Sequence, residues 1–215
     1  MHSRHLLRAG IGCALLAAVV TSLVIVRWAP LLSYDGTVAR SLHADAVGHP
    51  AVTSAMRVLT DWVWDPWTMR ALAAVACGWL WWRGDRRRAL LIAGAAVAAL
   101  LLSQGMKALV GRHRPIWPDP VVSADYAAYP SGHALTAAVV CPLLLWLVPR
   151  SAPKPWRLAA WILALASVFG VGFTRIFLGV HWLSDVLGGW LLGVALAVAV
   201  IALPDPRNRP KAAAG

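Results

Sequence analysis

The chain has 215 residues, of which 60% are hydrophobic and only 13% are charged. Soluble domains carry about a quarter charged residues, and a core of this size could not bury so much apolar surface, so lipid must cover part of it. The net charge of +11 would suit a nucleic-acid binder. The basic residues, however, lie between apolar runs and form no continuous stripe, so no nucleic acid is expected as a partner.

Apolar runs without charge recur along the whole chain. A helix needs about 20 residues to cross the hydrocarbon core, because each residue rises by only about 1.5 Å. Most of the runs approach this length once their flanks are included. The second run must also include Pro66–Arg70, with the Arg70 side chain reaching a headgroup. The runs are Ala9–Val26, Ala71–Trp82, Ala89–Met106, Ala134–Val148, Leu158–Thr174 and Val186–Leu203.

These runs predict an all-α, polytopic membrane bundle with about six transmembrane helices. A cleaved signal peptide is the alternative for Ala9–Val26, but no clear small-x-small cleavage site follows it, so an uncleaved anchor is favoured. Apolar residues recur at roughly helical spacing through Tyr34–Asp65, which predicts an amphipathic interfacial helix broken near Gly48 and Pro50. We expect one membrane domain, residues 1–203, and a disordered cytoplasmic tail, residues 204–215.

The distribution of basic residues predicts the orientation. With the N-terminus inside, the inner segments hold twelve of the 20 basic residues, and the outer segments hold the other eight. The positive-inside rule favours this arrangement in a bacterial plasma membrane. The twelve are Arg4, Arg8, Arg83, Arg86, Arg87, Arg88, Arg150, Lys154, Arg157, Arg207, Arg209 and Lys211.

Three segments hold polar residues that a plain membrane bundle would not need. The first runs from Lys107 to Pro115 at the end of the third span, the second is Pro130-Ser-Gly-His133 at the start of the fourth, and the third runs from Thr174 to Asp185 between the fifth and sixth. The six-span topology places all three on the outer, extracytoplasmic face. This convergence predicts a site on that face.

The first two segments suit the binding of an anion. Lys107 and Arg114 are about two helical turns apart, so both side chains could point the same way if the helix persists; two cations that merely reach the interface are the alternative. Ser131 is a plausible helix N-cap, and Gly132 permits close backbone approach. Free N–H groups at a helix start bind phosphate oxygens. A helix cap without function is the alternative here.

The third segment contains a histidine and an aspartate four residues apart. His181 and Asp185 therefore share one face of a helix. A carboxylate there can accept the Nδ1 proton of His181, which leaves Nε2 free to act as a nucleophile. Such a pair is more often a plain polar contact, but ionisable groups at a membrane face are functional candidates.

Taken together, the three segments resemble the signature of the type 2 phosphatidic acid phosphatase superfamily. The matching patterns are Lys-x6-Arg-Pro, Pro-Ser-Gly-His and Thr-Arg-x5-His-x3-Asp. That superfamily includes lipid phosphate phosphatases, glucose-6-phosphatase and soluble vanadium haloperoxidases. One position departs from it, because Thr174 stands where the family usually has serine. Threonine keeps the hydroxyl, so a phosphate contact survives if there is room for the methyl group.

The resemblance implies a role for each matching residue. His181 attacks phosphorus and forms a phosphohistidine, Asp185 orients it, and His133 protonates the leaving oxygen and then helps to activate water. The residues expected to hold the phosphoryl oxygens are Lys107, Arg114, Ser131, Gly132, Thr174 and Arg175. Phosphoryl transfer depends mainly on positioning and on neutralising these oxygens, so no metal and no cofactor is expected. Arg112, His113 and His49 match no motif position and are interpreted as interfacial.

The expected activity is therefore removal of the terminal phosphate from a lipid phosphate or lipid diphosphate. Phosphatidic acid, phosphatidylglycerophosphate and polyprenyl diphosphate all fit, so the lipid substrate and the bilayer are the expected partners. A soluble haloperoxidase is disfavoured by the apolar runs. A non-catalytic lipid-binding or transport protein with a relict phosphate site remains the alternative, against which the intact His133, His181 and Asp185 speak.

Overall fold

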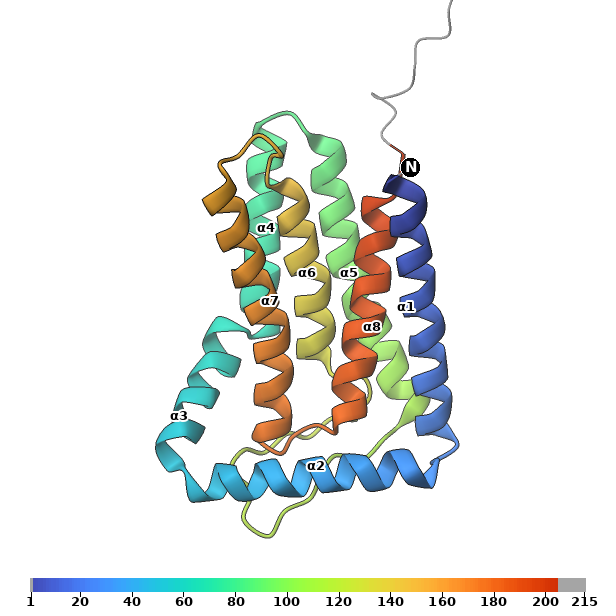
Figure 1. Ribbon diagram of the computed structural model, residues 1–215, viewed down its shortest axis with the longest axis vertical. Coiled ribbons are helices and arrows are strands. Elements are labelled where there is room, and N and C mark those ends of the chain that lie inside the picture. The colour runs from blue at the N-terminus through green and yellow to red at the C-terminus, as the bar shows by residue number, and fades with distance from the viewer. Residues whose placement is uncertain (1, 205–215) are drawn as a thin grey trace, which may run out of the picture.

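The computed structural model describes residues 2–204, and within that range all regular secondary structure is helical (Figure 1). This confirms the all-α prediction. The elements in chain order are α1 (His2–Ile25), α2 (Ala29–Gly48), α3 (Pro50–Val58), the short π-helix η1 (Leu59–Val63), α4 (Pro66–Trp82), α5 (Arg86–Val110), α6 (Gly132–Leu147), α7 (Lys154–Phe177) and α8 (Leu183–Ile201).

Helix α6 forms the centre of the bundle. It packs against α4, α5, α7 and α8, and Leu135, Val139 and Leu143 on it are buried. Its contact with α8 is close because glycines of α8 face it: a Cβ on Gly193 would lie only 2.6 Å from the Cβ of Ala138. A larger residue at that position would push the two helices apart. Close packing here brings the first turn of α6 beside the first turn of α8.

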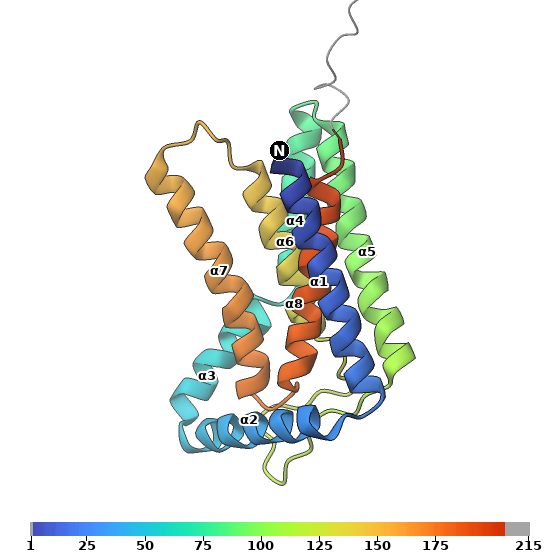
Figure 2. The ribbon, with the colours of Figure 1, turned by 45° about the vertical axis from the view of Figure 1, so that its right-hand side comes forward.

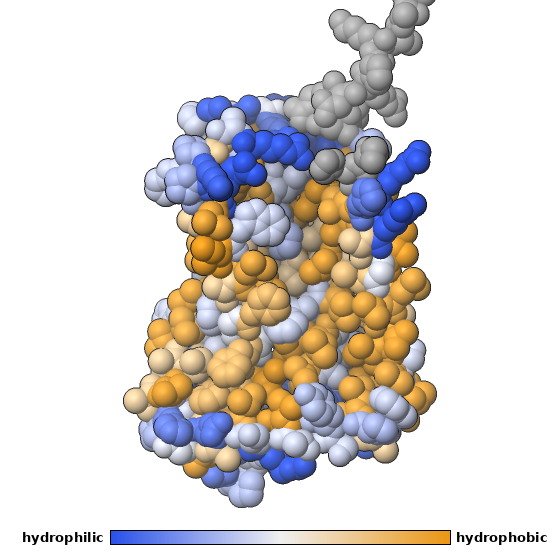
Figure 3. Space-filling model, viewed as in Figure 1, coloured by the Kyte–Doolittle hydropathy of each residue, from blue (hydrophilic) through white to orange (hydrophobic). Residues whose placement is uncertain are grey.

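Apolar side chains cover the middle of the face of the bundle drawn in Figure 3, between two more polar ends. Among the described residues, four helices are long and apolar enough to span a membrane, namely α1 from Arg4, α5, α7 and α8. Each of the six predicted runs lies largely within a helix, but α4 and α6 have only 17 and 16 residues. The fold is that of a multi-pass membrane protein, and the count of six spans stays a prediction.

Helix α2 lies across one end of the bundle, as Figures 1 and 2 show from two directions. It ends at Gly48, and α3 begins at Pro50 after His49. The predicted break near Gly48 and Pro50 is therefore confirmed. Asp35, His43 and Ala46 on α2 are buried, whereas much of its other surface is exposed. The helix is thus attached to the bundle through one face.

The segments that carry the predicted cytoplasmic basic residues lie at one end of the bundle. The N-terminal end of α1, the turn between α4 and α5, and the connection between α6 and α7 lie at the end opposite α2 (Figure 1). The basic segments predicted to be cytoplasmic therefore share one end, as far as they fall within residues 2–204. Of the predicted tail, residues 204–215, only Pro204 lies among the described residues.

Candidate active site

The three polar segments meet at the end of the bundle that α2 covers. Helix α5 ends there, α6 begins there, and the connection between α7 and α8 crosses it (Figure 1). A backbone hydrogen bond from Ser131 N to the carbonyl oxygen of Asp185, 2.9 Å long, joins the second segment directly to the third. The predicted convergence on one face of the bundle is confirmed.

The hydrogen bonds of His181 define its tautomer. Its Nδ1 lies 3.3 Å from Oδ2 of Asp185, and its Nε2 lies 3.1 Å from Nη1 of Arg114. A guanidinium can only donate, so Nε2 must accept and the ring proton belongs on Nδ1, where Asp185 accepts it. This tautomer carries a lone pair on Nε2, which can attack phosphorus when Arg114 donates to a phosphoryl oxygen instead.

The surroundings of His181 keep its ring neutral. The side chain is almost fully buried, and desolvation is the largest cause that lowers its pKa well below the usual range. The positive charges of Arg114, Arg175 and Lys107 lower the pKa further, while a contact with the Ala128 carbonyl acts weakly in the opposite direction. A neutral imidazole is the nucleophilic form, so both burial and the neighbouring cations favour it.

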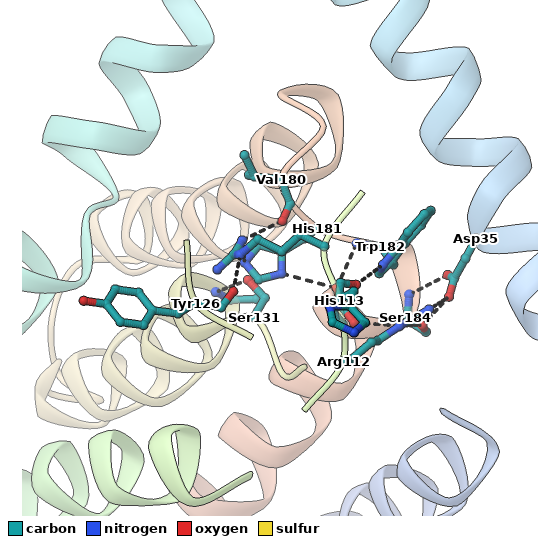
Figure 4. A network of polar contacts seen from close by, with 12 residues as sticks. Asp35, Arg112, His113, Tyr126, Ser131, Val180, His181, Trp182 and Ser184 are labelled. Carbon is teal, nitrogen blue, oxygen red and sulfur yellow. Dashed lines mark hydrogen bonds and ion pairs between the residues drawn. The ribbon is translucent and has the colours of Figure 1, made fainter. Parts of the chain in front are cut away.

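Asp185 is held by a larger network than the sequence indicated (Figure 4). Its Oδ2 accepts from the Trp182 backbone N–H at 2.9 Å, and its Oδ1 accepts from Nη1 of Arg112 at 2.6 Å. Arg112 also donates from Nη2 to Asp35 on α2 at 2.7 Å. The interpretation of Arg112 as a merely interfacial residue is therefore wrong. His113 and His49 are exposed, and their position at the membrane interface stays a prediction.

The cations expected to bind phosphate surround His181 from three elements. Arg175 comes from α7, Lys107 from α5 and Arg114 from the loop after α5. The helix does not persist from Lys107 to Arg114, because α5 ends at Val110 and Gly111 adopts a left-handed φ of 57°. The two cations thus approach the site by different routes, and the expectation that they share one helix face is wrong.

Arg175 has unused hydrogen-bonding capacity. It is buried, its Nη1 donates to Thr60 Oγ1 at 3.3 Å, and its Nε finds no partner among residues 2–204. A buried guanidinium without a full set of acceptors is costly unless another acceptor binds to it. The oxygens of a phosphoryl group are suitable acceptors.

Ser131 and Gly132 open α6 as the sequence predicts. Ser131 is the N-cap, and its Oγ accepts from Ala134 N at 3.5 Å. A Cβ on Gly132 would lie 3.3 Å from Oγ of Ser103, a buried hydroxyl of α5 with no partner among the described residues. The hydroxyl of Thr174 instead donates to the Val171 carbonyl at 2.8 Å, so its proton is already used and its contact with phosphate stays a prediction.

His133 lies on the first turn of α6, close to a carboxylate that belongs to none of the three motifs. Its Nε2 is 3.8 Å from Oδ2 of Asp65, the N-cap of α4. Asp61 and Asp65 also lie near enough to attract the charge of Arg175. The corner between α3 and α4 therefore borders the site, and an acidic pair four residues apart is the sequence signal that could have indicated it.

A cavity of about 480 Å³ adjoins Arg114 on the side of α1 and α5. Its wall combines cationic side chains, Arg27 and Arg114, with apolar ones such as Val24, Leu32 and Leu109. Among the described residues, no group of three or more His, Cys, Asp or Glu side chains is placed to hold a metal ion. Arg114 lies beside Nε2 of His181, and Arg175 and Lys107 act on the same ring; these cations attract anions and repel Mg²⁺.

The sequence is similar to those of several known phosphatases. Phosphatidylglycerophosphatase B of Bacillus subtilis is 35% identical over 98 residues, 45% of this chain and 48% of that protein. The undecaprenyl-diphosphatase of Sulfolobus acidocaldarius is 30% identical over 142 residues, 62% of this chain and 59% of that protein. The chain thus spans about half to three fifths of the length of these two relatives. A decaprenylphosphoryl-5-phosphoribose phosphatase of Mycobacterium tuberculosis is 34% identical over 130 residues, 59% of this chain and 67% of that protein.

The fold is also similar to a solved structure. The crystal structure of a transmembrane PAP2-type phosphatidylglycerolphosphate phosphatase from Bacillus subtilis superposes with a TM-score of 0.79, covering 89% of this chain and 93% of that one at 23% identity. Residues 88–209, more than half of the chain, match the family model described as the PAP2 superfamily. The same stretch contains all three motifs, and the chain therefore belongs to the PAP2 superfamily.

Proposed function

We propose that this protein hydrolyses the terminal phosphate of a lipid phosphate or lipid diphosphate through a phosphohistidine on His181. The observation that carries the proposal is the state of His181: a neutral ring whose Nε2 lone pair faces Arg114, with Arg175 and Lys107 close by. A phosphoryl group held by these cations would present its phosphorus to Nε2. The names of the relatives, which are phosphatases and a diphosphatase, support the same chemistry.

The reaction has two steps. In the first, Nε2 of His181 attacks phosphorus, the bond from phosphorus to the lipid oxygen breaks, and His133 gives a proton to that oxygen. In the second, His133 takes a proton from water, the water oxygen attacks the phosphohistidine, and inorganic phosphate leaves with Nε2 restored. Lys107, Arg114, Arg175 and the N–H groups at the start of α6 neutralise the oxygens in both steps.

The cavity beside Arg114 supports a lipid as the substrate. An anionic headgroup suits Arg27 and Arg114, and the chain attached to it suits the apolar wall formed by Val24, Leu32 and Leu109. A substrate could therefore place its phosphate in the site while its tails stay in the bilayer.

Release of phosphate from a panel of lipids tests the proposal. Purified protein in detergent is incubated with phosphatidic acid, phosphatidylglycerophosphate and a polyprenyl diphosphate, and inorganic phosphate is measured. Turnover of at least one of them, lost in the His181→Ala variant, is the expected result. Saturable binding of these lipids without any turnover would instead identify a lipid-binding protein with a relict site.

We expect the activity to be independent of metal ions. Cations of the protein already occupy the positions from which Mg²⁺ would neutralise a phosphoryl group, so excess EDTA should leave the rate unchanged. Vanadate mimics phosphate and should inhibit competitively. Phosphate release in the presence of each compound measures both effects. Complete loss on chelation, restored by added metal, would contradict the proposal.

The site is proposed to face the extracytoplasmic side of a plasma membrane. The basic residues Arg83–Arg88 and Arg150–Arg157 should lie in the cytoplasm by the positive-inside rule. A reporter that works only in the cytoplasm should therefore be active when fused after Arg88 and inactive when inserted within Ile116–Tyr129. The opposite pattern would place the site inside the cell.

A further inference from the structure

Asp185 is a buried carboxylate whose contacts extend well beyond His181. It is fully buried, and one of its oxygens is used by Nδ1 of His181 and the Trp182 N–H. The other oxygen is paired with Nη1 of Arg112 at 2.6 Å. Arg112 is itself only 11% exposed in its side chain. The cation closest to this carboxylate is therefore one that the family motif does not include.

A second buried carboxylate shares the same guanidinium. Asp35 of α2, 1% exposed, accepts from Nη2 of Arg112 at 2.7 Å. Its other contacts lie on the first turn of α8, where Ser184 donates its backbone N–H at 2.9 Å and its hydroxyl at 2.5 Å. Asp35 thus caps the helix that carries Asp185, and Arg112 joins both carboxylates (Figure 4).

The physical consequence concerns the charge of Asp185. A carboxylate removed from water takes up a proton unless a cation or several donors stabilise its anion. Protonated Asp185 can donate its O–H to Nδ1 and is a weaker acceptor than the carboxylate, so it no longer fixes the proton of His181 on Nδ1. The ring could then place its proton on Nε2, and the lone pair needed for attack would be lost.

We infer that Arg112 and Asp35 are positioning residues for the nucleophile: Arg112 keeps Asp185 ionised and aimed at His181, and Asp35 fixes Arg112 and the first turn of α8. The inference rests on the proposed function of His181. It assigns to the interfacial helix α2 a direct part in the geometry of the site. Neither residue contacts the phosphoryl group in this role.

Several other groups face Asp185 and contribute to its state. They are His181 and Trp182 from the connection before α8, Arg114 and Tyr129 from the loop between α5 and α6, and Lys107 from α5. Replacing Arg112 leaves all of these residues in the chain. A change in pH dependence on replacing Arg112 alone therefore reports on the pair formed with Asp185.

The test compares the pH dependence of phosphate release in three variants with the wild type. Arg112→Gln should lower kcat by about 10–100-fold near neutral pH, the usual loss when an outer-shell partner is removed. The acid limb of its pH profile, where activity falls as Asp185 takes up a proton, should move to higher pH. The difference in kcat from the wild type should therefore become smaller as pH rises. Arg112→Lys should return the acid limb to its wild-type position, because the charge is restored.

The Asp35→Asn variant tests whether Asp35 positions Arg112 or only supports the first turn of α8. The amide oxygen can still accept from Ser184, while the loss of a negative charge near Asp185 favours its ionised form. The acid limb should therefore stay in place or move to lower pH, whereas kcat should fall, because the amide NH₂ now faces Nη2 of Arg112 and no longer fixes it. Arg40→Gln, at an exposed position of α2, is the matched control and should behave as wild type.

The outcomes distinguish this inference from the proposed function. A wild-type protein without phosphatase activity refutes the proposed function itself. Two results with an active wild type refute only the positioning roles. An unchanged acid limb in Arg112→Gln refutes the role of Arg112. Wild-type kcat in Asp35→Asn, or an acid limb that moves to higher pH in that variant, refutes the role of Asp35. If Arg112→Gln fails to fold, the double variant Asp35→Asn/Arg112→Gln is compared with Asp35→Asn, and the same upward displacement is required.

Discussion

Replacing His181 with alanine is expected to abolish turnover, with a loss of roughly 10⁴-fold or more, since removing a covalent nucleophile from a protease costs up to about 10⁶-fold. The ring is buried, neutral and turned so that Nε2 faces the cations. Alanine leaves the phosphate-binding groups in place but removes the atom that forms the bond. Phosphate release and trapping of a labelled phosphoenzyme by rapid acid quench measure the two consequences.

The matched control for this variant is His5→Ala, because His5 is exposed on α1 at the opposite end of the bundle. It should retain full activity and the same phosphoenzyme. A second expectation follows from the binding groups: the His181→Ala variant should still bind vanadate or a lipid phosphate. A phosphoenzyme that forms in His181→Ala, on another histidine, would refute the assignment of the nucleophile.

The chemistry of the site could be predicted from the sequence because it lies in short local patterns. Ser131 as a helix cap and the contact between His181 and Asp185 involve neighbours within four residues. The expectation that His181 and Asp185 share one helix face is wrong, however, because α8 begins at Leu183 and His181 lies in the connection before it. Counting apolar runs then placed these patterns at one end of the bundle, and that placement is confirmed. The local motifs and the order of the apolar runs were sufficient to predict that these residues share one end of the bundle.

The geometry of Lys107 and Arg114 shows where local patterns fail. Both residues lie near His181, but they do not do so as neighbours on one helix, because α5 ends at Val110. Gly111 takes the left-handed conformation that commonly terminates helices, and the chain then crosses the site as an irregular loop. A helical period could not be extended through such a glycine.

The residues that were missed are joined by contacts across long stretches of sequence. Asp35 lies 149 residues before Ser184, and Arg112 lies 73 residues before Asp185. Nothing in the neighbourhood of Asp35 indicates that α2 folds back against the first turn of α8. The corner with Asp61 and Asp65 was missed for the same reason, since its approach to Arg175 depends on how η1 packs on α7. Tertiary packing of this kind requires coordinates.

Replacing His133 with alanine is expected to have an effect that depends on the leaving group. Its Nε2 lies on the first turn of α6, close to Asp65 and on the same side of the bundle as Arg175 and His181. General acid–base catalysis contributes about 10²–10⁴-fold to a rate. A lipid alkoxide is a poor leaving group and needs the proton, whereas a nitrophenolate leaves as an anion and needs it much less.

The expected result is therefore a loss of about 10²–10⁴-fold on an alkyl phosphate and a clearly smaller loss on nitrophenyl phosphate. Single-turnover measurements of phosphoenzyme formation make the comparison independent of the second step, in which His133 also takes part. His5→Ala again serves as the control and should keep the wild-type rate on each of the two substrates. Equal losses on the alkyl and aryl phosphates in the first step would mean that His133 binds the phosphoryl group rather than protonating the leaving oxygen. The roles of the two histidines would then have to be reassigned, with His181 alone responsible for bond formation and another group supplying the proton.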